Sequence, residues 1–493
     1  MEKKPKIVLV WLRRDLRLED NQALAEAIRQ AEITEAKVLP LFIFDTNILD
    51  SLKDRKDKRV TFIYNRIADL HQKLTQMGST LNVAVGDPLK VLNELIQFYS
   101  IAAVVTAEDY EPYAIKRDQA VADVLKSHSI PFHSITDQVI FSPGKVLKAD
   151  STPYTVFTPY ANKWKALVTH EDLIGAAPVY DLPKLKSCLF LLPSPTFLFT
   201  TSSTSTSTST STSSSPSSSF ASSSASSSAS SSYHSSSNYT DLFPMPSLSQ
   251  LGFEKAVTGW PEVNLTSNLL KDYNSNRDYP ALQGTTQISL SLRFGLLSIR
   301  HLVKLALNTS EVWLNELIWR EFFMQILYYY PQVVTQSFKP AYDRIVWRND
   351  KSEFMRWTEG TTGFPLVDAG MRQLNETGLM HNRVRMVVAS FLCKHLLIDW
   401  RLGEAYFAEK LLDYDLSANN GNWQWAAGTG CDAAPYFRIF NPYEQQKKFD
   451  PNFEYIKKWV PEFGTNKYAP PMVEHTFARA RALKIYKEGL VLV

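Results

Sequence analysis

The chain has 493 residues, of which 44% are hydrophobic and 21% are charged, and its formal net charge at pH 7 is +3. This length predicts about two to four domains with large apolar cores. So small a net charge excludes binding of polyanions by overall charge alone, so any nucleic-acid surface must be local. The longest uncharged apolar stretch, 188–199, is too short to span a membrane and contains two prolines. No signal peptide is expected.

The cysteine content limits the class of protein further. Three are present, without paired spacing. They disfavour a disulfide framework and a thiolate metal site, and they fit a reducing, cytoplasmic environment. We therefore expect a cytoplasmic protein without a metal site.

The first part of the chain alternates two patterns. Apolar, β-rich runs alternate with segments of helical periodicity; the runs are 6–12, 38–45, 80–86 and 102–109, and the helical segments are 21–31, 58–77, 88–99 and 116–128. Continuous apolar strands predict an open, Rossmann-like parallel sheet covered on both faces, in an α/β domain of residues 1–135. The first strand runs into WLRRDLRLEDN without a glycine-rich turn, so a nicotinamide dehydrogenase is disfavoured.

A low-complexity segment follows. No Asp, Glu, Lys or Arg occurs between Lys186 and Asp241, and residues 200–238 are almost entirely Ser, Thr and Ala. Such a segment buries too little apolar surface to offset its ordering entropy. We therefore predict an interdomain linker over 136–250 with a disordered part at about 200–238.

From residue 251 to 493 the pattern is that of an all-α domain. Its helix candidates are 311–330, 365–378, 381–399 and 402–413. The first ends at Pro331 and the second at Gly378, as helices commonly do. The fold class is thus an α/β domain joined by a long linker to an all-α domain.

Tryptophans are concentrated in this helical part. Seven of eleven fall between residues 313 and 425. They indicate either a large helical core or an aromatic enclosure for a planar cofactor. Within NNGNWQWAAGTG, Trp423 and Trp425 lie about 200° apart around a helix, so one indole can face the interior and the other an approaching molecule.

Glu316, Trp319 and Arg320 share one face of the helix at 311–330. This face is either a surface ion pair beside a half-buried indole or the wall of a pocket. A second cluster, Arg383 and Arg385, lies at a helix start, where cations oppose the macrodipole unless an anion is near.

Asp413 and Asp415 are candidate partners for those arginines. The pairing is either an ordinary structural ion pair or a buried pair that faces a cofactor. Thr285, Thr286 and Ser289 precede a helical pattern and suit either a bound anion such as a diphosphate or simple helix capping.

Several segments together resemble the DNA photolyase/cryptochrome family. They are VWLRRDLRLEDN (10–21), VFTPY (156–160), VWLNELIWREFF (312–323), TGFPLVDAGMRQLNETGLMHNRVRM (362–386) and DLSANNGNWQWAAGTGCDAAPYFRIFNP (415–442). The resemblance covers nearly the whole chain except the Ser/Thr-rich segment. MHNRVRM and NNGNWQWAAGTG are most similar to class I cyclobutane pyrimidine dimer (CPD) photolyases, whereas a (6-4) photolyase would have a histidine-containing motif around 382–386.

The resemblance implies an α/β antenna domain and a helical domain that holds folded FAD, active in its reduced form. The residues expected to contact FAD are Tyr273, Thr285, Thr286, Gln287, Ile288, Ser289, Trp313, Arg320, Asn382, Arg385, Asp413, Tyr414, Asp415 and Asn419. Asn419 is expected at the flavin N5, and Arg385 paired with Asp413 alongside the ring. Gln287 and Leu290 depart from the family pattern, so the contact expected from Gln287 is through its backbone.

The resemblance also implies an electron-transfer chain, with Trp423 facing inward, then Trp400 and Trp347. The residues expected to bind damaged DNA are Arg277, Glu316, Trp319, Asn382, Arg383, Met386, Trp425 and Arg438. Among them Glu316 is assigned a catalytic role, because a carboxyl group can hydrogen-bond or protonate the pyrimidine carbonyls.

The function so implied is light-dependent repair of CPDs in UV-damaged DNA, by electron transfer from excited reduced FAD to a flipped-out dimer. The alternative is a cryptochrome-like blue-light photoreceptor without repair activity. Glu111 matches a carboxylate that contacts an antenna chromophore. That chromophore is methenyltetrahydrofolate, 8-hydroxy-deazaflavin or a second flavin, unless the site is empty. We expect a monomer without a membrane partner, nucleoid-associated if bacterial.

Overall fold

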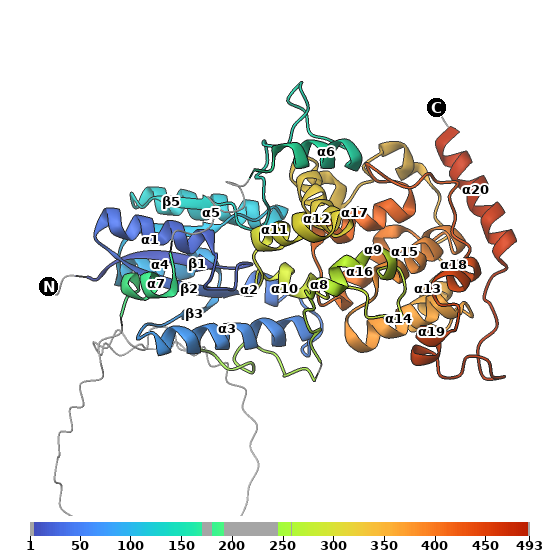
Figure 1. Ribbon diagram of the computed structural model, residues 1–493, viewed down its shortest axis with the longest axis horizontal. Coiled ribbons are helices and arrows are strands. Elements are labelled where there is room, and N and C mark those ends of the chain that lie inside the picture. Colours follow the sequence, from blue (N-terminus) through green and yellow to red (C-terminus); the bar gives the residue numbers. More distant parts are fainter. Residues whose placement is uncertain (1–3, 170–179, 192–244, 258, 492–493) are drawn as a thin grey trace, which may run out of the picture.

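The computed structural model describes residues 4–169, 180–191, 245–257 and 259–491. Figure 1 shows an α/β body at one end and a helical body at the other. The low-complexity part of the predicted linker, 200–238, lies outside the described residues. None of the helices within the described ranges is both long and apolar enough to cross a bilayer.

The α/β body is built on a parallel five-stranded sheet of order β3-β2-β1-β4-β5. Its strands are β1 (Lys6–Leu12), β2 (Lys37–Asp45), β3 (Asn82–Gly86), β4 (Ser100–Ala107) and β5 (Phe132–Ile135). The four predicted strands are confirmed. Sequence reasoning missed β5, because this edge strand has only four residues, none of which is fully buried.

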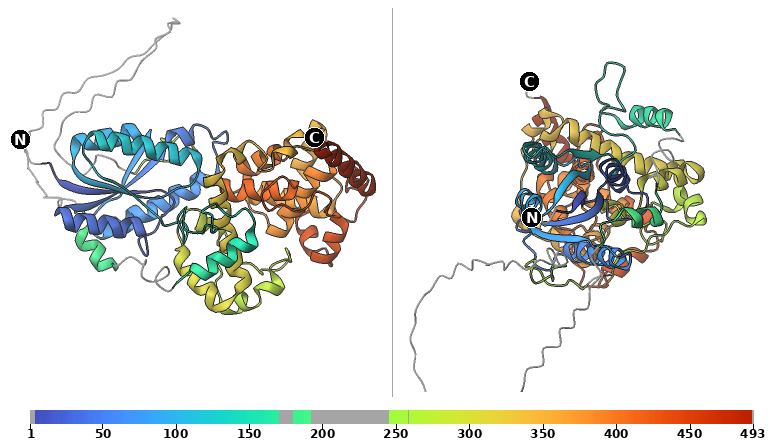
Figure 2. Two further views of the ribbon diagram at one scale, coloured as in Figure 1. Left: turned by 90° about the horizontal axis from the view of Figure 1, so that it is seen from above. Right: turned by 90° about the vertical axis from the view of Figure 1, so that its left-hand side faces the viewer.

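Both faces of the sheet are covered, as Figure 2 shows. On β1, Val8, Val10 and Leu12 pack into one core, and the residues between them pack into the other. Helices α1 (Gln22–Thr34) and α3 (Lys58–Gln76) cover the first face, and α4 (Pro88–Phe98) and α5 (Pro112–Ser127) cover the second. Burial on both faces explains the continuous apolar runs.

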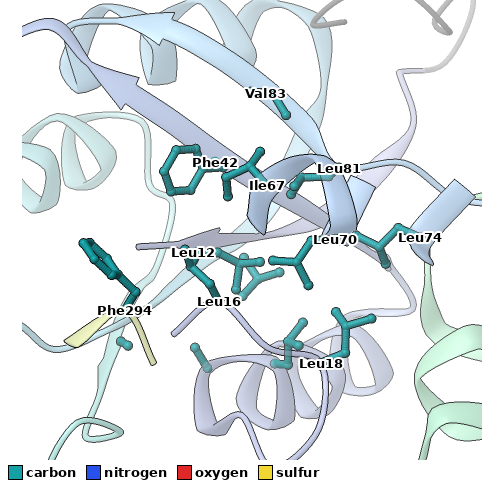
Figure 3. Packing of buried hydrophobic residues seen from close by; sticks show 14 of the residues in the cluster. Leu12, Leu16, Leu18, Phe42, Ile67, Leu70, Leu74, Leu81, Val83 and Phe294 are labelled. Atoms are coloured by element: carbon teal, nitrogen blue, oxygen red, sulfur yellow. The ribbon is translucent and has the colours of Figure 1, made fainter. Parts of the chain in front are cut away.

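The core on the first face extends beyond the α/β body. In Figure 3, Phe294 lies near Leu12 and Leu16 although it belongs to the carboxyl-terminal half of the chain. A buried ion-pair network reinforces this junction: Asp137 accepts hydrogen bonds from Arg17 at 2.7 Å and from Arg300 at 3.0 Å. The two bodies therefore share a continuous interior.

The helical body surrounds a central pair of helices, α12 (Glu311–Tyr329) and α17 (Leu416–Ala427). Gly421 of α17 leaves room for the ring of Phe323, which a Cβ atom would overlap. The other helices are α2 (Thr46–Leu49) of the first body and α8 (Ser267–Lys271), α9 (Tyr273–Asn276), α10 (Ser289–Arg293), α11 (Ile299–Thr309), α13 (Lys351–Glu359), α14 (Pro365–Thr377), α15 (Asn382–Ser390), α16 (Trp400–Lys410), α18 (Pro442–Phe449), α19 (Glu454–Trp459) and α20 (His475–Val491).

One predicted helix was wrong in its length. The pattern at 381–399 predicted a single helix, but α15 ends at Ser390 and a π-helical turn, Phe391–His395, follows. Leu397 then adopts a positive φ of 52°, and Asp399 starts α16 by accepting a hydrogen bond from the Arg401 amide at 3.0 Å. Uniform burial hides this break, because apolar residues continue through it.

The connection between the bodies contains α6 (Phe157–Leu167) and α7 (Leu182–Cys188). Glu321 of α12 attaches this connection to the helical body. The Glu321 carboxylate accepts hydrogen bonds from the amides of Ile140 and Phe141 and, at 2.7 Å, from the indole of Trp164. Burial raises the pKa of Glu321 to about 7, and these hydrogen bonds oppose that rise.

The described residues on either side of 192–244 both contact the α/β body. Before this segment, the amide of Phe190 donates to the carbonyl of Val38 at 2.8 Å. After it, the amide of Glu254 donates to the carbonyl of Arg55 at 2.8 Å, and Phe253 packs into the core of the sheet.

Candidate functional site

A cavity lies among α15, α16 and α17 and encloses about 600 Å³ of free space, its open mouth included. The predicted site residues on its wall are Asn382, Arg385, Met386, Asp413, Asp415, Asn419, Trp423 and Trp425. The others that line it are Ala389, Phe407, Leu411, Ala418, Asn422 and Ala426. The cavity thus unites predicted cofactor residues with predicted DNA-binding residues.

The two indoles of α17 have different surroundings. Trp423 is 2% exposed and packs against Phe407, with ring centroids 5.0 Å apart, and against Trp357 at 6.1 Å. Gly403 of α16 permits this packing, because a Cβ atom there would overlap the Trp423 ring. Trp425 is half-buried on the cavity wall. One indole is thus held in the core and the other is accessible from the cavity.

The arginine at the start of α15 has the anionic partner that the sequence suggested. The Arg385 guanidinium donates to both carboxylate oxygens of Asp413, at 2.9 and 3.1 Å, and its Nε donates to the Met380 carbonyl at 2.8 Å. Asp413 thereby offsets the repulsion between this cation and the helix dipole. The pair presents a fixed polar edge to the cavity.

Asn419 is oriented by a residue that sequence reasoning missed. Its Nδ2 donates to the carboxylate of Glu404 at 2.8 Å and to the Glu404 carbonyl at 3.1 Å. Burial raises the pKa of Glu404. Because both hydrogen bonds use the amide nitrogen, the Oδ1 atom of Asn419 is left as an acceptor. No spacing in the sequence linked these two residues.

Asp415 joins the cavity to the α/β body. This residue begins α17 by accepting a hydrogen bond from the Ala418 amide at 3.2 Å, and it forms ion pairs with Arg14 and with Arg293 at 3.3 Å. Burial alone would raise the pKa of Asp415, but the cations Arg14 and Arg320 bring it below its ordinary value.

Glu111, the predicted antenna residue, belongs to the same ion-pair network. Its carboxylate lies 3.1 Å from a guanidinium nitrogen of Arg14 and 3.1 Å from one of Arg293. Burial and the neighbouring charges of Asp109 and Asp415 raise its pKa to about 7, while Arg14 opposes that rise. Arg14 and Asp109 follow β1 and β4, where the strand order reverses and α/β folds bind ligands. Sequence reasoning assigned no role to Arg14 or Arg293.

A second group of predicted DNA-binding residues lies on α12 and beside it. Arg277 pairs with Glu316, and Arg383 donates to Asp278 at 2.8 Å. Burial raises the pKa of Glu316, against the effect of Arg277. Asp278, which the sequence did not single out, also lies 3.8 Å from Arg277. The arginines therefore occur as paired cations.

Trp319 and Arg438 complete the predicted DNA-binding set. The indole of Trp319 stacks on Phe157, an aromatic partner that sequence reasoning did not foresee. Arg438 is exposed in the segment that follows α17. Neither residue lines the cavity described above.

The remaining predicted cofactor residues do not line this cavity, and the cofactor contacts of both groups stay predictions. They are Tyr273, Thr285, Thr286, Gln287, Ile288, Ser289, Trp313, Arg320 and Tyr414. Gln287 has a φ of 54° and is exposed, and its amide donates to the Thr285 hydroxyl at 2.8 Å. Arg320 donates to the carbonyl of Gln138 at 2.5 Å, and burial lowers its pKa to about 10.

The predicted electron-transfer residues differ in exposure. Trp400 is 1% exposed with the guanidinium of Arg401 4.7 Å from its ring centre, whereas Trp347 is half-buried with its ring 5.9 Å from that of Tyr486. Trp423 contacts Trp357, a fully buried indole without an assigned role. In the part of the chain that the structure describes, no three His, Cys, Asp or Glu side chains are grouped to hold a metal.

Fold and cavity together define a two-domain flavoprotein: a parallel-sheet domain beside a helical domain with an aromatic cavity. Residues 8–179 match the family model described as DNA photolyase, and residues 313–466 match that of the FAD binding domain of DNA photolyase. The chain is also 34% identical to the deoxyribodipyrimidine photo-lyase of Synechococcus sp., with 98% of this chain and 96% of the relative covered. The chain belongs to the DNA photolyase family.

Two solved photolyase structures are similar to this structure over nearly the whole chain. A bacterial class III photolyase from Agrobacterium tumefaciens is 29% identical, with a TM-score of 0.77 and coverage of 99% of this chain and 98% of its own. An archaeal photolyase from Sulfolobus tokodaii, whose structure contains two FAD molecules, is 31% identical, with a TM-score of 0.73 and coverage of 98% and 99%. The predicted fold class is confirmed.

Proposed function

We propose that the chain repairs cyclobutane pyrimidine dimers in UV-damaged DNA in a light-dependent reaction. The observation that carries this proposal is the shared cavity, in which Asn419 and the Arg385–Asp413 pair lie together with Trp425 and Met386. Polar groups suited to a flavin edge and apolar groups suited to pyrimidines thus line one space. The names of the curated relatives point to the same reaction.

The cavity residues fit FAD. The Asn419 Oδ1 is left to accept from a ring N–H, and the Arg385–Asp413 pair offers a donor and an acceptor along a planar edge. Reduced FAD, when bound, supplies on excitation the electron that opens the cyclobutane ring. The protein's own contribution is to orient this group and to exclude water from it.

We assign the substrate side of the cavity to Trp425, Met386 and Asn382. An indole offers a stacking surface, a thioether adapts to irregular apolar shapes, and an amide hydrogen-bonds to base edges. A dimer is already poorly paired and stacked in duplex DNA, so flipping it out costs less than flipping an intact base. That difference supplies part of the selectivity.

We assign Glu316 and Trp319 to the flipped dimer, and the nearby arginines to the DNA around it. Burial raises the pKa of Glu316, and its carboxyl group is assigned to a hydrogen bond with a pyrimidine carbonyl. Arg277, Arg383 and the exposed Arg438 are assigned to phosphate groups, which position the duplex without reading its sequence.

The tryptophans provide the route by which the bound cofactor is reduced. Trp423 touches the cavity, Trp400 is buried, and Trp347 is partly exposed, so the last of them is open to a reductant in solution. A second, light-harvesting chromophore completes the proposal, and methenyltetrahydrofolate is one candidate. The structure of the Sulfolobus tokodaii relative contains two FAD molecules, which implies a novel light-harvesting cofactor in that protein. An absorption spectrum of the purified protein identifies the chromophore here.

The decisive experiment mixes FAD-loaded, reduced protein with UV-irradiated oligothymidine, in blue light and in darkness, and counts dimers by chromatography. We expect dimers to disappear only in the light. Dimers that persist in the light, with the flavin bound and reduced, contradict the repair function and leave the photoreceptor alternative.

A further inference from the structure

The segment VFTPY (156–160) supplies an aromatic partner to Trp319. The ring of Phe157, the first residue of α6, lies parallel to the indole, with centroids 3.7 Å apart and an interplanar angle of 4°. Such close parallel stacking occupies one face of the indole. A base that contacts Trp319 must therefore use the remaining surface of the ring.

Phe157 is itself held from two sides. Val156, at the N-cap position of α6, provides no side-chain cap, and the carboxylate of Asp432 instead accepts from the Phe157 amide at 2.8 Å. One turn and two turns further along α6, Tyr160 and Trp164 donate to Glu321 of α12, at 3.3 and 2.7 Å. The start of α6 is thus fastened to the segment after α17 and to α12.

Two further rings pack against other parts of the indole, which stays partly exposed. Phe322 meets it edge-on, at 5.6 Å and 83°, and Phe323 lies at 5.3 Å with a tilt of 32°. Phe322 and Phe323 belong to the same helix as Trp319, so they move with it. Phe157 comes from the interdomain connection and fixes the indole relative to the rest of the protein.

We infer that Phe157 is a positioning residue for damaged DNA, which holds the Trp319 indole in the plane that a flipped dimer contacts. This inference rests on the proposed function, because it requires that Trp319 contact the lesion. An aromatic pair of this kind is typically worth about a three- to tenfold change in an equilibrium constant.

The test measures binding of damaged DNA in the dark, where no repair takes place. Full-length, FAD-loaded protein is titrated with a fluorescent oligonucleotide that contains one thymine dimer, and with the same oligonucleotide undamaged. The variants are Phe157→Ala, Phe157→Leu, Phe157→Tyr, Trp319→Ala and the double variant of Phe157→Ala with Trp319→Ala. Tyr154→Ala is the matched control, because Tyr154 is a half-buried ring of the same connection that contacts Tyr160.

We expect Phe157→Ala to weaken dimer binding about three- to tenfold and to leave undamaged DNA and flavin absorbance unchanged. Phe157→Tyr should retain wild-type affinity and Phe157→Leu should fall between them. In protein that already carries Trp319→Ala, adding Phe157→Ala should not weaken dimer binding further, because the indole that Phe157 positions is absent. If Phe157→Ala loses its flavin through misfolding, the Leu and Tyr variants still decide the question.

An unchanged Kd for the dimer in Phe157→Ala overturns the inference. So does an equal loss with and without Trp319, because Phe157 would then act by another route. A wild-type protein that binds both oligonucleotides equally contradicts the proposed function instead, so the two failures are distinguishable.

Discussion

The guanidinium of Arg14 donates to the carboxylate of Asp415, although 401 positions separate the two residues. Arg14 follows the central strand of the α/β domain, and Asp415 begins the helix whose indoles wall the cavity. The contact between the domains is therefore made at the edge of the site, and domain placement and cavity shape depend on the same ion pairs.

Replacing Arg14 should disturb stability and cofactor binding together. Arg14→Met leaves Glu111 buried with Arg293, and Asp415 buried with Arg293 and Arg320, and loss of one member of such a network costs about 3 kcal/mol of unfolding free energy. Urea denaturation measures the loss, and flavin absorbance after gel filtration measures retention. Arg29→Met, which breaks an exposed pair with Glu26, should leave both unchanged. Wild-type stability in Arg14→Met would show that the ion pair contributes nothing.

The raised pKa of Glu111 predicts that the free energy of unfolding depends on pH. Its pKa is raised from an ordinary value of 4.5 to about 7, so the folded protein holds this proton more tightly than the unfolded chain. The resulting stabilisation is complete below pH 4.5 and is lost as the pH rises through about 7. Glu111→Gln, which does not titrate, should match the wild type near pH 5 and exceed it near pH 8 by on the order of 2 kcal/mol. Thermal unfolding at both pH values measures this difference; a constant difference would contradict the raised pKa.

Glu404 should affect flavin binding through Asn419. Glu404→Leu removes the carboxylate, one of the two acceptors of the Asn419 amide nitrogen, and leaves one buried N–H unpaired at a cost of about 1–3 kcal/mol. Glu404→Gln retains an oxygen at that position. We expect the Leu variant to bind FAD about tenfold more weakly and the Gln variant to stay near wild type. Fluorescence titration of the apoprotein measures both, and equal affinities would mean that Glu404 does not orient Asn419.

Trp347 should matter for reduction and not for repair. Trp347→Phe removes the partly exposed end of the proposed route, so photoreduction of oxidised flavin should slow at least tenfold. Protein reduced chemically beforehand should repair at the wild-type rate. Trp459→Phe changes another half-buried indole, on α19, and should alter neither. Parallel losses of photoreduction and repair in Trp347→Phe would contradict this division of labour.

Local patterns in the sequence predicted much of the architecture. Long apolar runs identified β1 to β4, and charge at a helix start identified Asp413 as one of two candidate partners for the arginines, of which the resemblance selected the Arg385–Asp413 pair. The strand β5 was missed because it has only four residues, none of which is fully buried, and the π-helical turn after Ser390 was missed because buried apolar residues continue through it.

Contacts between distant segments could not be predicted in the same way. Helical spacing relates residues three or four positions apart, so it groups Glu316 with Trp319 and Arg320. It carries no information on Phe157 against Trp319, or on Glu404 against Asn419, since each pair joins two separate elements. The resemblance supplied the roles of single residues, and the structure supplied the partners that orient them.

The hydrogen bonds on either side of residues 192–244 determine how much a change in the length of that interval affects the protein. Phe190 and Glu254 are both hydrogen-bonded to the α/β domain, so the connection between them begins and ends on the same domain. Closing such a loop costs free energy that grows only with the logarithm of its length, roughly 0.6 kcal/mol for each doubling. Insertions and deletions there are consequently nearly neutral for the distance between the α/β sheet and the helical domain.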